Sequence, residues 1–141
     1  MNSYLDTSAL LKLVIVERET DIVTAVWSQV DDPHMSVLGY TEMRAALAAS
    51  VRSGRIPLPA AAVARAQLDA VWRRLIAVEI DEALVRDASD LTDLHRLRAA
   101  DAIHLASAIR IREPDTAFVA FDARLRAAAA QEGFLVLPEE S

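Results

Sequence analysis

The chain has 141 residues and a mass of 15.4 kDa, which is enough for one domain that builds its own hydrophobic core. Hydrophobic residues make up 53% of the sequence and charged residues 26%, with only 3 glycines and 5 prolines, which excludes a disordered, collagen-like or low-complexity chain. The sequence contains no cysteine, which excludes disulfides and thiolate zinc sites, and its net charge of −6 argues against simple electrostatic binding of nucleic acid.

Short β-like runs alternate with longer helical patterns in the first half of the chain. Strands are predicted at residues 3–5, ended by Asp6, and at residues 34–37. Thr7 or Ser8 is the expected N-cap of the first helix, and Gly54 the expected C-terminal cap of the third. Helices are predicted over four ranges: 9–13, 22–30, about 40–52 and 60–75.

The second half continues the alternation. Asp81 is the expected N-cap of a helix that carries one apolar stripe as far as Leu94. Two further helices are predicted at about 99–112 and at 123–131, and strands are predicted at 76–80, 116–121 and 134–137. Strands that alternate with helices predict a three-layer α/β fold, with a central, mostly parallel sheet flanked by helices. We expect residues 1–141 to form one such domain.

The N-terminal segment has no basic start followed by a long apolar run, so it is not expected to act as a secretory signal. No stretch reaches the roughly 18 apolar residues of a membrane-spanning helix. The expected location is therefore the cytoplasm, with no membrane partner.

Two carboxylates directly follow predicted strands. Asp6 comes after the first strand and Asp122 after the fourth. In open parallel sheets, ligands bind beyond the carboxyl ends of the strands, so these acids are candidates for a functional site. Each of them is also well suited to capping the helix that follows, and that alternative stays open.

Two more acids lie near the starts of helices rich in alanine and leucine. Glu42 follows the second predicted strand, and Asp101 begins the helix near residue 99. Carboxylates that meet at one edge of a sheet repel one another and raise one another's pKa. A hard divalent cation such as Mg²⁺ removes that conflict, and it can activate water for the hydrolysis of a phosphodiester.

The sequence resembles the PIN-domain family, and more narrowly the VapC ribonuclease toxins of bacterial type II toxin–antitoxin systems. Four segments carry the resemblance in order through the chain: residues 4–10 (YLDTSAL), 41–42 (TE), 98–106 (RAADAIHLA) and 121–122 (FD). The resemblance implies a PIN-like fold with an acidic pocket that binds Mg²⁺ or Mn²⁺. By matching position, the pocket acids are Asp6, Glu42, Asp101 and Asp122. Many relatives carry Thr or Ser two residues before the last acid, whereas this chain has Ala120, so we rank Asp122 below the others.

The function that the resemblance implies is metal-dependent endoribonuclease action, in which metal-activated water hydrolyses an RNA phosphodiester. Thr7 and Ser8 are candidates for hydrogen bonds that support the site, besides their role as caps. Arg98 and Arg124 lie close in sequence to two of the acids and are candidate contacts to RNA phosphates. The resemblance also implies a VapB-like antitoxin that covers the first two helices, and a homodimer.

His104 lies three residues after Asp101, on nearly the same helix face. We expect it to be a core histidine hydrogen-bonded to the backbone, while a metal role is conceivable. Trp27 and Trp72 lie at helical core spacing and are expected to pack in the interior rather than to stack on bases.

Two other classes of function stay open. A phosphorelay receiver also has an acidic Mg²⁺ pocket at the ends of parallel strands. It needs an adjacent pair of acids and a late lysine, whereas Asp6 is followed by Thr7 and Lys12 is the single lysine. A catalytically idle PIN-like RNA-binding or scaffold module would be expected to lack one of the acids, yet all four are present.

Overall fold

A five-stranded sheet in the order β3-β2-β1-β4-β5 organises the structure, a computed structural model that describes residues 2–16 and 18–139. Every pair of neighbouring strands is parallel, so the mostly parallel sheet expected from the sequence is parallel throughout. The strands are β1 (Asn2–Leu5), β2 (Asp32–Ser36), β3 (Ile76–Val78), β4 (Ala117–Val119) and β5 (Leu135–Leu137).

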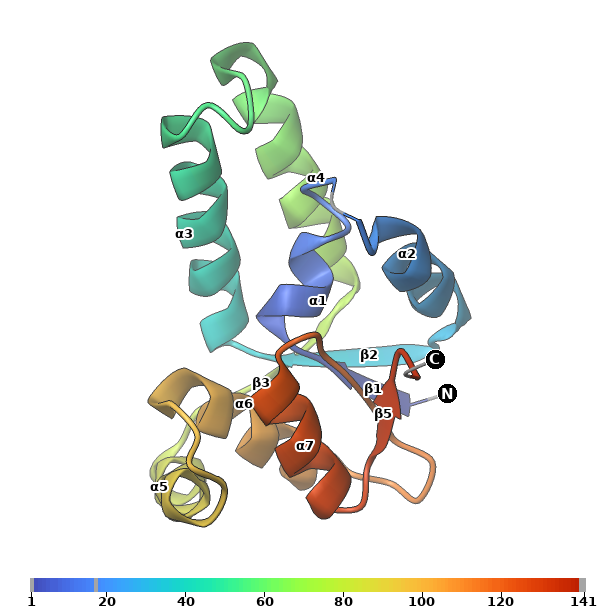
Figure 1. Ribbon diagram of the computed structural model, residues 1–141, viewed down its shortest axis with the longest axis vertical. Coiled ribbons are helices and arrows are strands. Elements are labelled where there is room, and N and C mark those ends of the chain that lie inside the picture. Colours follow the sequence, from blue (N-terminus) through green and yellow to red (C-terminus); the bar gives the residue numbers. More distant parts are fainter. Residues whose placement is uncertain (1, 17, 140–141) are drawn as a thin grey trace.

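Helices cover both faces of this sheet, which confirms the three-layer α/β architecture (Figure 1). One face carries α1 (Thr7–Leu11), α2 (Thr20–Gln29), α3 (Leu38–Arg52) and α4 (Ala61–Arg74). The other face carries α5 (Glu82–His95), α6 (Ala99–Arg110) and α7 (Ala123–Gln131). Among the described residues, none of the helices combines the length and hydrophobicity needed to cross a lipid bilayer.

The strands separate two hydrophobic cores because successive side chains of a strand point to opposite faces. Tyr4 packs in the core under α5, α6 and α7, whereas Leu5 packs under α1 and α3. Phe118 and Val119 of β4 divide in the same way. These strands are buried on both sides, which explains their nearly continuous apolar character.

Several local predictions are tested by the ends of the helices. Asp81 caps α5, accepting the amide hydrogen of Leu84, and Gly54 follows α3 with a positive φ of 81°, so both predicted caps are confirmed. The predicted cap of α1 is wrong. Asp6 is the N-cap, and Thr7 and Ser8 lie inside the first helical turn. An aspartate at the end of β1 takes that role because its carboxylate reaches the amide of Ala9.

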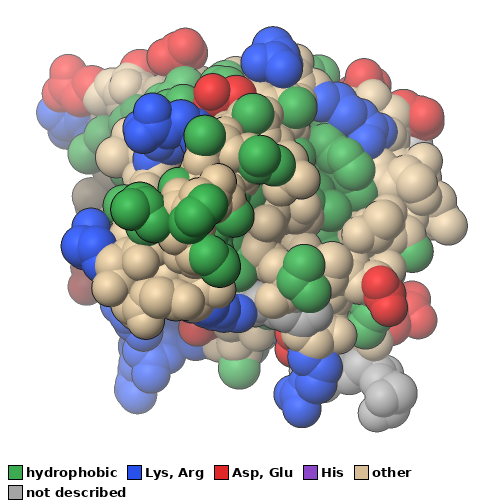
Figure 2. Space-filling model, turned by 90° about the horizontal axis from the view of Figure 1, so that it is seen from above, with side chains coloured by type: hydrophobic (Ala, Val, Ile, Leu, Met, Phe, Trp, Pro, Cys, Tyr) green, Lys and Arg blue, Asp and Glu red, His purple; other side chains and the backbone are tan. Residues whose placement is uncertain are grey.

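The helix layer of α1 to α4 exposes large apolar side chains. Val16 is 85% exposed, and Leu58, Val63 and Ile22 are also exposed. Viewed from the end where α3 and α4 project from the sheet, hydrophobic side chains lie among positively charged ones (Figure 2). Two of these exposed side chains, Val16 and Ile22, lie just after α1 and on α2, where the antitoxin implied by the family resemblance is expected to bind.

Candidate active site

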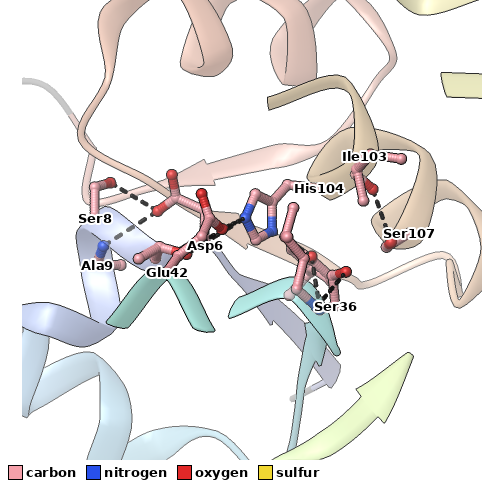
Figure 3. A network of polar contacts seen from close by, with 11 residues as sticks. Asp6, Ser8, Ala9, Ser36, Glu42, Ile103, His104 and Ser107 are labelled. Atoms are coloured by element: carbon pink, nitrogen blue, oxygen red, sulfur yellow. Dashed lines mark hydrogen bonds and ion pairs between the residues drawn. The ribbon is translucent and has the colours of Figure 1, made fainter. Parts of the chain in front are cut away.

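Asp6 is the first residue after β1 and lies at the carboxyl edge of the sheet, with only 4% of its surface exposed. Its Oδ1 accepts the amide hydrogen of Ala9 at 3.1 Å and the hydroxyl hydrogen of Ser8 at 2.7 Å (Figure 3). Burial raises the pKa of Asp6 to about 6, against the lowering influence of His104, Ser8 and the Ala9 amide. Asp6 therefore caps a helix, which was the alternative interpretation of its position, and it is also a buried acid whose ionised form is disfavoured.

Glu42 extends from the second turn of α3 toward Asp6 (Figure 3). Its Oε1 accepts two hydrogen bonds, from the Thr7 hydroxyl at 2.8 Å and from Nε2 of His104 at 2.6 Å. Burial alone would raise the pKa of Glu42. The hydrogen bond and the charge of His104, together with the hydrogen bond from Thr7, outweigh burial, so the pKa of Glu42 is lowered. Glu42 is consequently ionised at neutral pH. Thr7 and Ser8 both bond to acids of the site, but only Ser8 bonds to Asp6, and the contact of Thr7 with Glu42 was not predicted from the sequence.

Asp101 lies in the first turn of α6 and is half-buried. Burial raises its pKa, Asp122 and Glu42 raise it further, and His104 and Arg98 act in the opposite direction. Asp101 also raises the pKa of Asp6. Asp101 therefore interacts electrostatically with each of the other three acids, which come from the end of β1, from α3 and from the start of α7.

Asp122 is exposed and caps α7 through its Oδ1, which accepts the Leu125 amide hydrogen at 2.9 Å. It is close enough to Asp101 to raise that residue's pKa, but none of its contacts with described residues joins it to Asp6 or Glu42. Its position is therefore peripheral to Asp6 and Glu42.

The two predicted phosphate contacts differ in placement. Arg98 is the exposed N-cap residue of α6, and its charge lowers the pKa of Asp101, so it lies at the rim of the acidic site. Arg124 is exposed on α7 and donates to the backbone carbonyl of Arg96 at 3.4 Å. Arg98 is therefore the better placed of the two.

His104 corrects one prediction. It is buried, with 2% of its surface exposed, but its ring bonds to side chains rather than to the backbone. Nδ1 lies 2.7 Å from the hydroxyl of Tyr4, and Nε2 contacts Glu42. The sequence indicated that His104 lies near the acidic site, because it shares a helix face with Asp101. It did not indicate the contact with Tyr4, which lies a hundred residues away in sequence.

The chemistry of the donor atoms fits a hard divalent cation. Among described residues, Asp6 Oδ2, Glu42 Oε2 and the Asp101 oxygens accept no hydrogen bond, so these oxygens remain available. Across residues 2–16 and 18–139, no three acidic or histidine side chains converge closely enough to form a ready-made metal site. Mg²⁺ keeps several of its waters when bound and needs only one or two direct carboxylates, so the donor set fits this ion.

Comparison with known proteins agrees with this architecture. The PIN-domain family model matches residues 3–131. Ribonuclease VapC45 of Mycobacterium tuberculosis is 34% identical over 137 residues, covering 97% of this chain and 95% of the relative. Crystalline Mycobacterium tuberculosis VapC20, described as a toxin that cleaves the sarcin–ricin loop, superimposes with a TM-score of 0.68 at 17% identity, over 94% of this chain and 96% of that one. A toxin–antitoxin complex from Klebsiella pneumoniae contains a chain with a TM-score of 0.63 at 16% identity, over 86% of this chain and 87% of that one.

The α/β fold with its parallel sheet is thus shared with the solved VapC20 structure. The chain belongs to the PIN-domain family and, within it, to the VapC ribonucleases.

Proposed function

We propose that the protein is a divalent-metal-dependent endoribonuclease that acts as the toxin of a toxin–antitoxin pair. One observation carries the proposal: three acids that are far apart in sequence lie near one another at the carboxyl edge of the sheet, where Asp101 raises the pKa of Asp6 and Glu42 raises the pKa of Asp101. Close relatives of the chain are named ribonucleases, which supports the same activity.

In this proposal Asp6, Glu42 and Asp101 hold Mg²⁺, or Mn²⁺ in its place, directly or through its bound waters, and Asp122 completes the acidic pocket. The bound ion supplies activation of water and offsets the negative charge that develops on the phosphodiester. Ser8 and Thr7 orient Asp6 and Glu42 through the hydrogen bonds described above. Arg98 binds a neighbouring RNA phosphate, which compensates locally for the acidic net charge of the protein.

The proposed partner is an antitoxin that covers the exposed apolar side chains of the α1 to α4 layer, including Val16 and Ile22. The likeness to a chain of a toxin–antitoxin complex supports this partner. We propose that the protein acts in the cytoplasm, where its RNA substrate is found, and that it forms a homodimer.

An RNA-cleavage assay tests the activity. Purified protein is incubated with total RNA and Mg²⁺, and the RNA ends are sequenced. Attack by water with departure of the 3′-oxygen yields 5′-phosphate and 3′-hydroxyl ends. Asp101→Asn is expected to abolish the cuts, whereas Asp90→Asn, which changes an exposed acid on α5, leaves them unchanged.

Other outcomes identify the alternatives. Cut sites that are equally abundant with Asp101→Asn and with the unaltered protein contradict the nuclease proposal. RNA binding without any cleavage, in the presence of Mg²⁺ or Mn²⁺, indicates an idle binding module. Phosphorylation of Asp6 by acetyl phosphate indicates a receiver.

A growth assay tests the role as a toxin. Expression of the protein is expected to arrest growth, and expression of Asp101→Asn is not. Co-expression of the antitoxin is expected to restore growth and to shift the toxin to a larger species in size-exclusion chromatography. A protein that is harmless, monodisperse and monomeric when expressed alone contradicts both the toxin role and the homodimer.

A further inference from the structure

We propose that His104 is a positioning residue of the acidic site, which holds Glu42 beside Asp6 and leaves one Glu42 oxygen free for the cation. The inference rests on the proposed metal-dependent function and extends it to a residue outside the set of acids. Figure 3 shows His104 between Glu42 on one side and the buried chain of contacts around Ser36 on the other.

The hydrogen-bond partners determine which nitrogen of His104 carries a proton. The Tyr4 oxygen accepts the amide hydrogen of Ser36 at 2.9 Å, which leaves its own hydrogen for Nδ1 of His104 at 2.7 Å. Burial raises the pKa of Tyr4, so the phenol is neutral and can donate. Since ionised Glu42 can only accept, Nε2 carries the hydrogen that it donates to Oε1. The same Nε2–H is present in the imidazolium form, so the contact does not depend on the ring's charge.

Without this contact, the Thr7 hydroxyl is the one remaining hydrogen-bond partner of Glu42 among the described residues. The side chain of Glu42 has several rotatable bonds and is 29% exposed, so ordering it costs conformational entropy. His104 and Thr7 both donate to the same oxygen, Oε1, and therefore orient the carboxylate in one direction. The other oxygen, Oε2, accepts no hydrogen bond from described residues and is left for the ion.

The support for His104 comes from the rigid core. Tyr4 is fully buried and stacks on Phe118 with a centroid separation of 5.6 Å. The chain of contacts from Ser36 through Tyr4 and His104 to Glu42 joins β2, β1, α6 and α3. A partner that orients a metal-binding side chain in this way typically contributes 10- to 100-fold to metal affinity or activity.

His104→Leu and His104→Gln test the proposal, with Mn²⁺ alone as the calorimetric probe. Leucine removes the donor, and glutamine places an N–H₂ group at about the reach of Nε2. We expect His104→Leu to weaken Mn²⁺ binding about tenfold or more, and His104→Gln to recover most of that loss. RNA cleavage should follow the same order, with the change in kcat rather than in KM.

His95 provides a matched control. It is a second buried histidine, with a side chain 5% exposed, and its Nε2 lies 2.9 Å from Glu132. That contact joins the C-terminal ends of α5 and α7, away from the acidic edge. His95→Leu therefore removes an equivalent histidine–glutamate contact and is expected to leave Mn²⁺ affinity unchanged. Folding of every variant is checked by thermal unfolding.

A measurement on the unaltered protein keeps the inference testable if His104→Leu fails to fold. Nitrogen-15 NMR is expected to find a protonated Nε2 on His104 whose signal moves as Mg²⁺ is added. A ring protonated at Nδ1 alone, or a signal indifferent to Mg²⁺, overturns the proposal. So does a folded His104→Leu protein that binds Mn²⁺ as the unaltered protein does. If the unaltered protein binds no Mn²⁺ and cleaves no RNA, the proposed function itself is wrong.

Discussion

The hydroxyl of Ser8 lies 2.7 Å from Oδ1 of Asp6 and joins that acid to a second loop. Besides donating to Asp6, the same oxygen accepts the amide hydrogen of Phe121 at 3.2 Å. Phe121 directly precedes Asp122, so one side chain ties the end of β1 to the segment that leads into α7. Ser8 therefore supports both Asp6 and the segment that leads to Asp122.

Replacement of this bridge is expected to destabilise the protein. Ser8→Ala leaves the amide of Phe121 without its acceptor and removes a hydrogen bond to a carboxylate, a loss of about 1–2 kcal/mol in the free energy of unfolding. Urea denaturation measures it. Ser89→Ala, which removes an exposed hydroxyl on α5 bonded only to the helix backbone, should change stability by less than about 0.5 kcal/mol. Equal losses in the two variants contradict the bridging role.

The raised pKa of Asp6 predicts a specific pH dependence of stability. In the folded protein the pKa of Asp6 is about 6, above its ordinary value of 3.8, so the folded state keeps this proton to higher pH than the unfolded chain does. The stabilising contribution is complete below the lower value and is lost as pH rises through the higher one. Asp6→Asn retains an oxygen for the helix cap, and because asparagine does not ionise, its stability does not decrease as the pH rises through 6.

We therefore expect Asp6→Asn to be more stable than the unaltered protein at pH 8, by about 1–3 kcal/mol in the absence of divalent ions. At pH 3.5 the two proteins should be nearly equal. Denaturation curves between these values test the expectation, and a stability difference that does not change with pH refutes it.

Divalent ions should stabilise the unaltered protein at neutral pH, and the acids of the site should be needed for that effect. A ligand that binds only the folded state stabilises it, by about 2.7 kcal/mol at a concentration a hundred times its dissociation constant. Saturating Mg²⁺ is expected to raise the unfolding temperature of the unaltered protein by several degrees and that of Asp101→Asn by much less. Differential scanning calorimetry with and without EDTA provides the measurement. An equal increase in unfolding temperature for both proteins indicates that Mg²⁺ binds at another site.

Arg98 is expected to act on RNA binding rather than on the reaction itself. Arg98→Ala removes a phosphate contact, which should raise KM several-fold while kcat changes little. Raising the salt concentration should weaken RNA binding by the unaltered protein more steeply than by the variant. Arg124→Ala, which removes a side chain turned toward the Arg96 carbonyl, is expected to have a smaller effect. The reverse ranking would place the RNA along α7 instead.

Gly39 is required for packing at the start of α3. A Cβ at this position would overlap the end of the buried Met35 side chain and lie 2.8 Å from its Cγ. Gly39→Ala should therefore cost about 1–3 kcal/mol, despite the higher helix propensity of alanine. Because the cost comes from one neighbour, the same change in a Met35→Ala background should cost much less. Chemical denaturation of the four proteins tests this coupling.

The fold was largely predictable from local patterns. The apolar runs before Asp6 and Asp122 and the helical stripe after Asp81 each correspond to a real element at nearly the predicted bounds. Parallel topology follows because strands alternate with helices. The placement of Asp6 at the carboxyl edge followed from its position directly after a strand, without any knowledge of its neighbours.

The side-chain contacts of the site were less predictable. Sequence spacing places His104 near Asp101 but does not reveal that Tyr4 and Glu42 lie at opposite ends of its ring, because both come from distant segments. The cap of α1 was misassigned because Asp6, Thr7 and Ser8 are all good capping residues and only the backbone geometry separates them.

Asp6 and Asp122 each use one carboxylate oxygen to cap a helix. Asparagine retains such an oxygen while it loses the charge, and one nucleotide change converts an aspartate codon into an asparagine codon. Under the proposed toxin function, a bacterium that makes this protein thus has a short genetic route to an inactive version that keeps both helix caps. Populations harmed by the active protein should accumulate intact but inert alleles more readily than truncated ones.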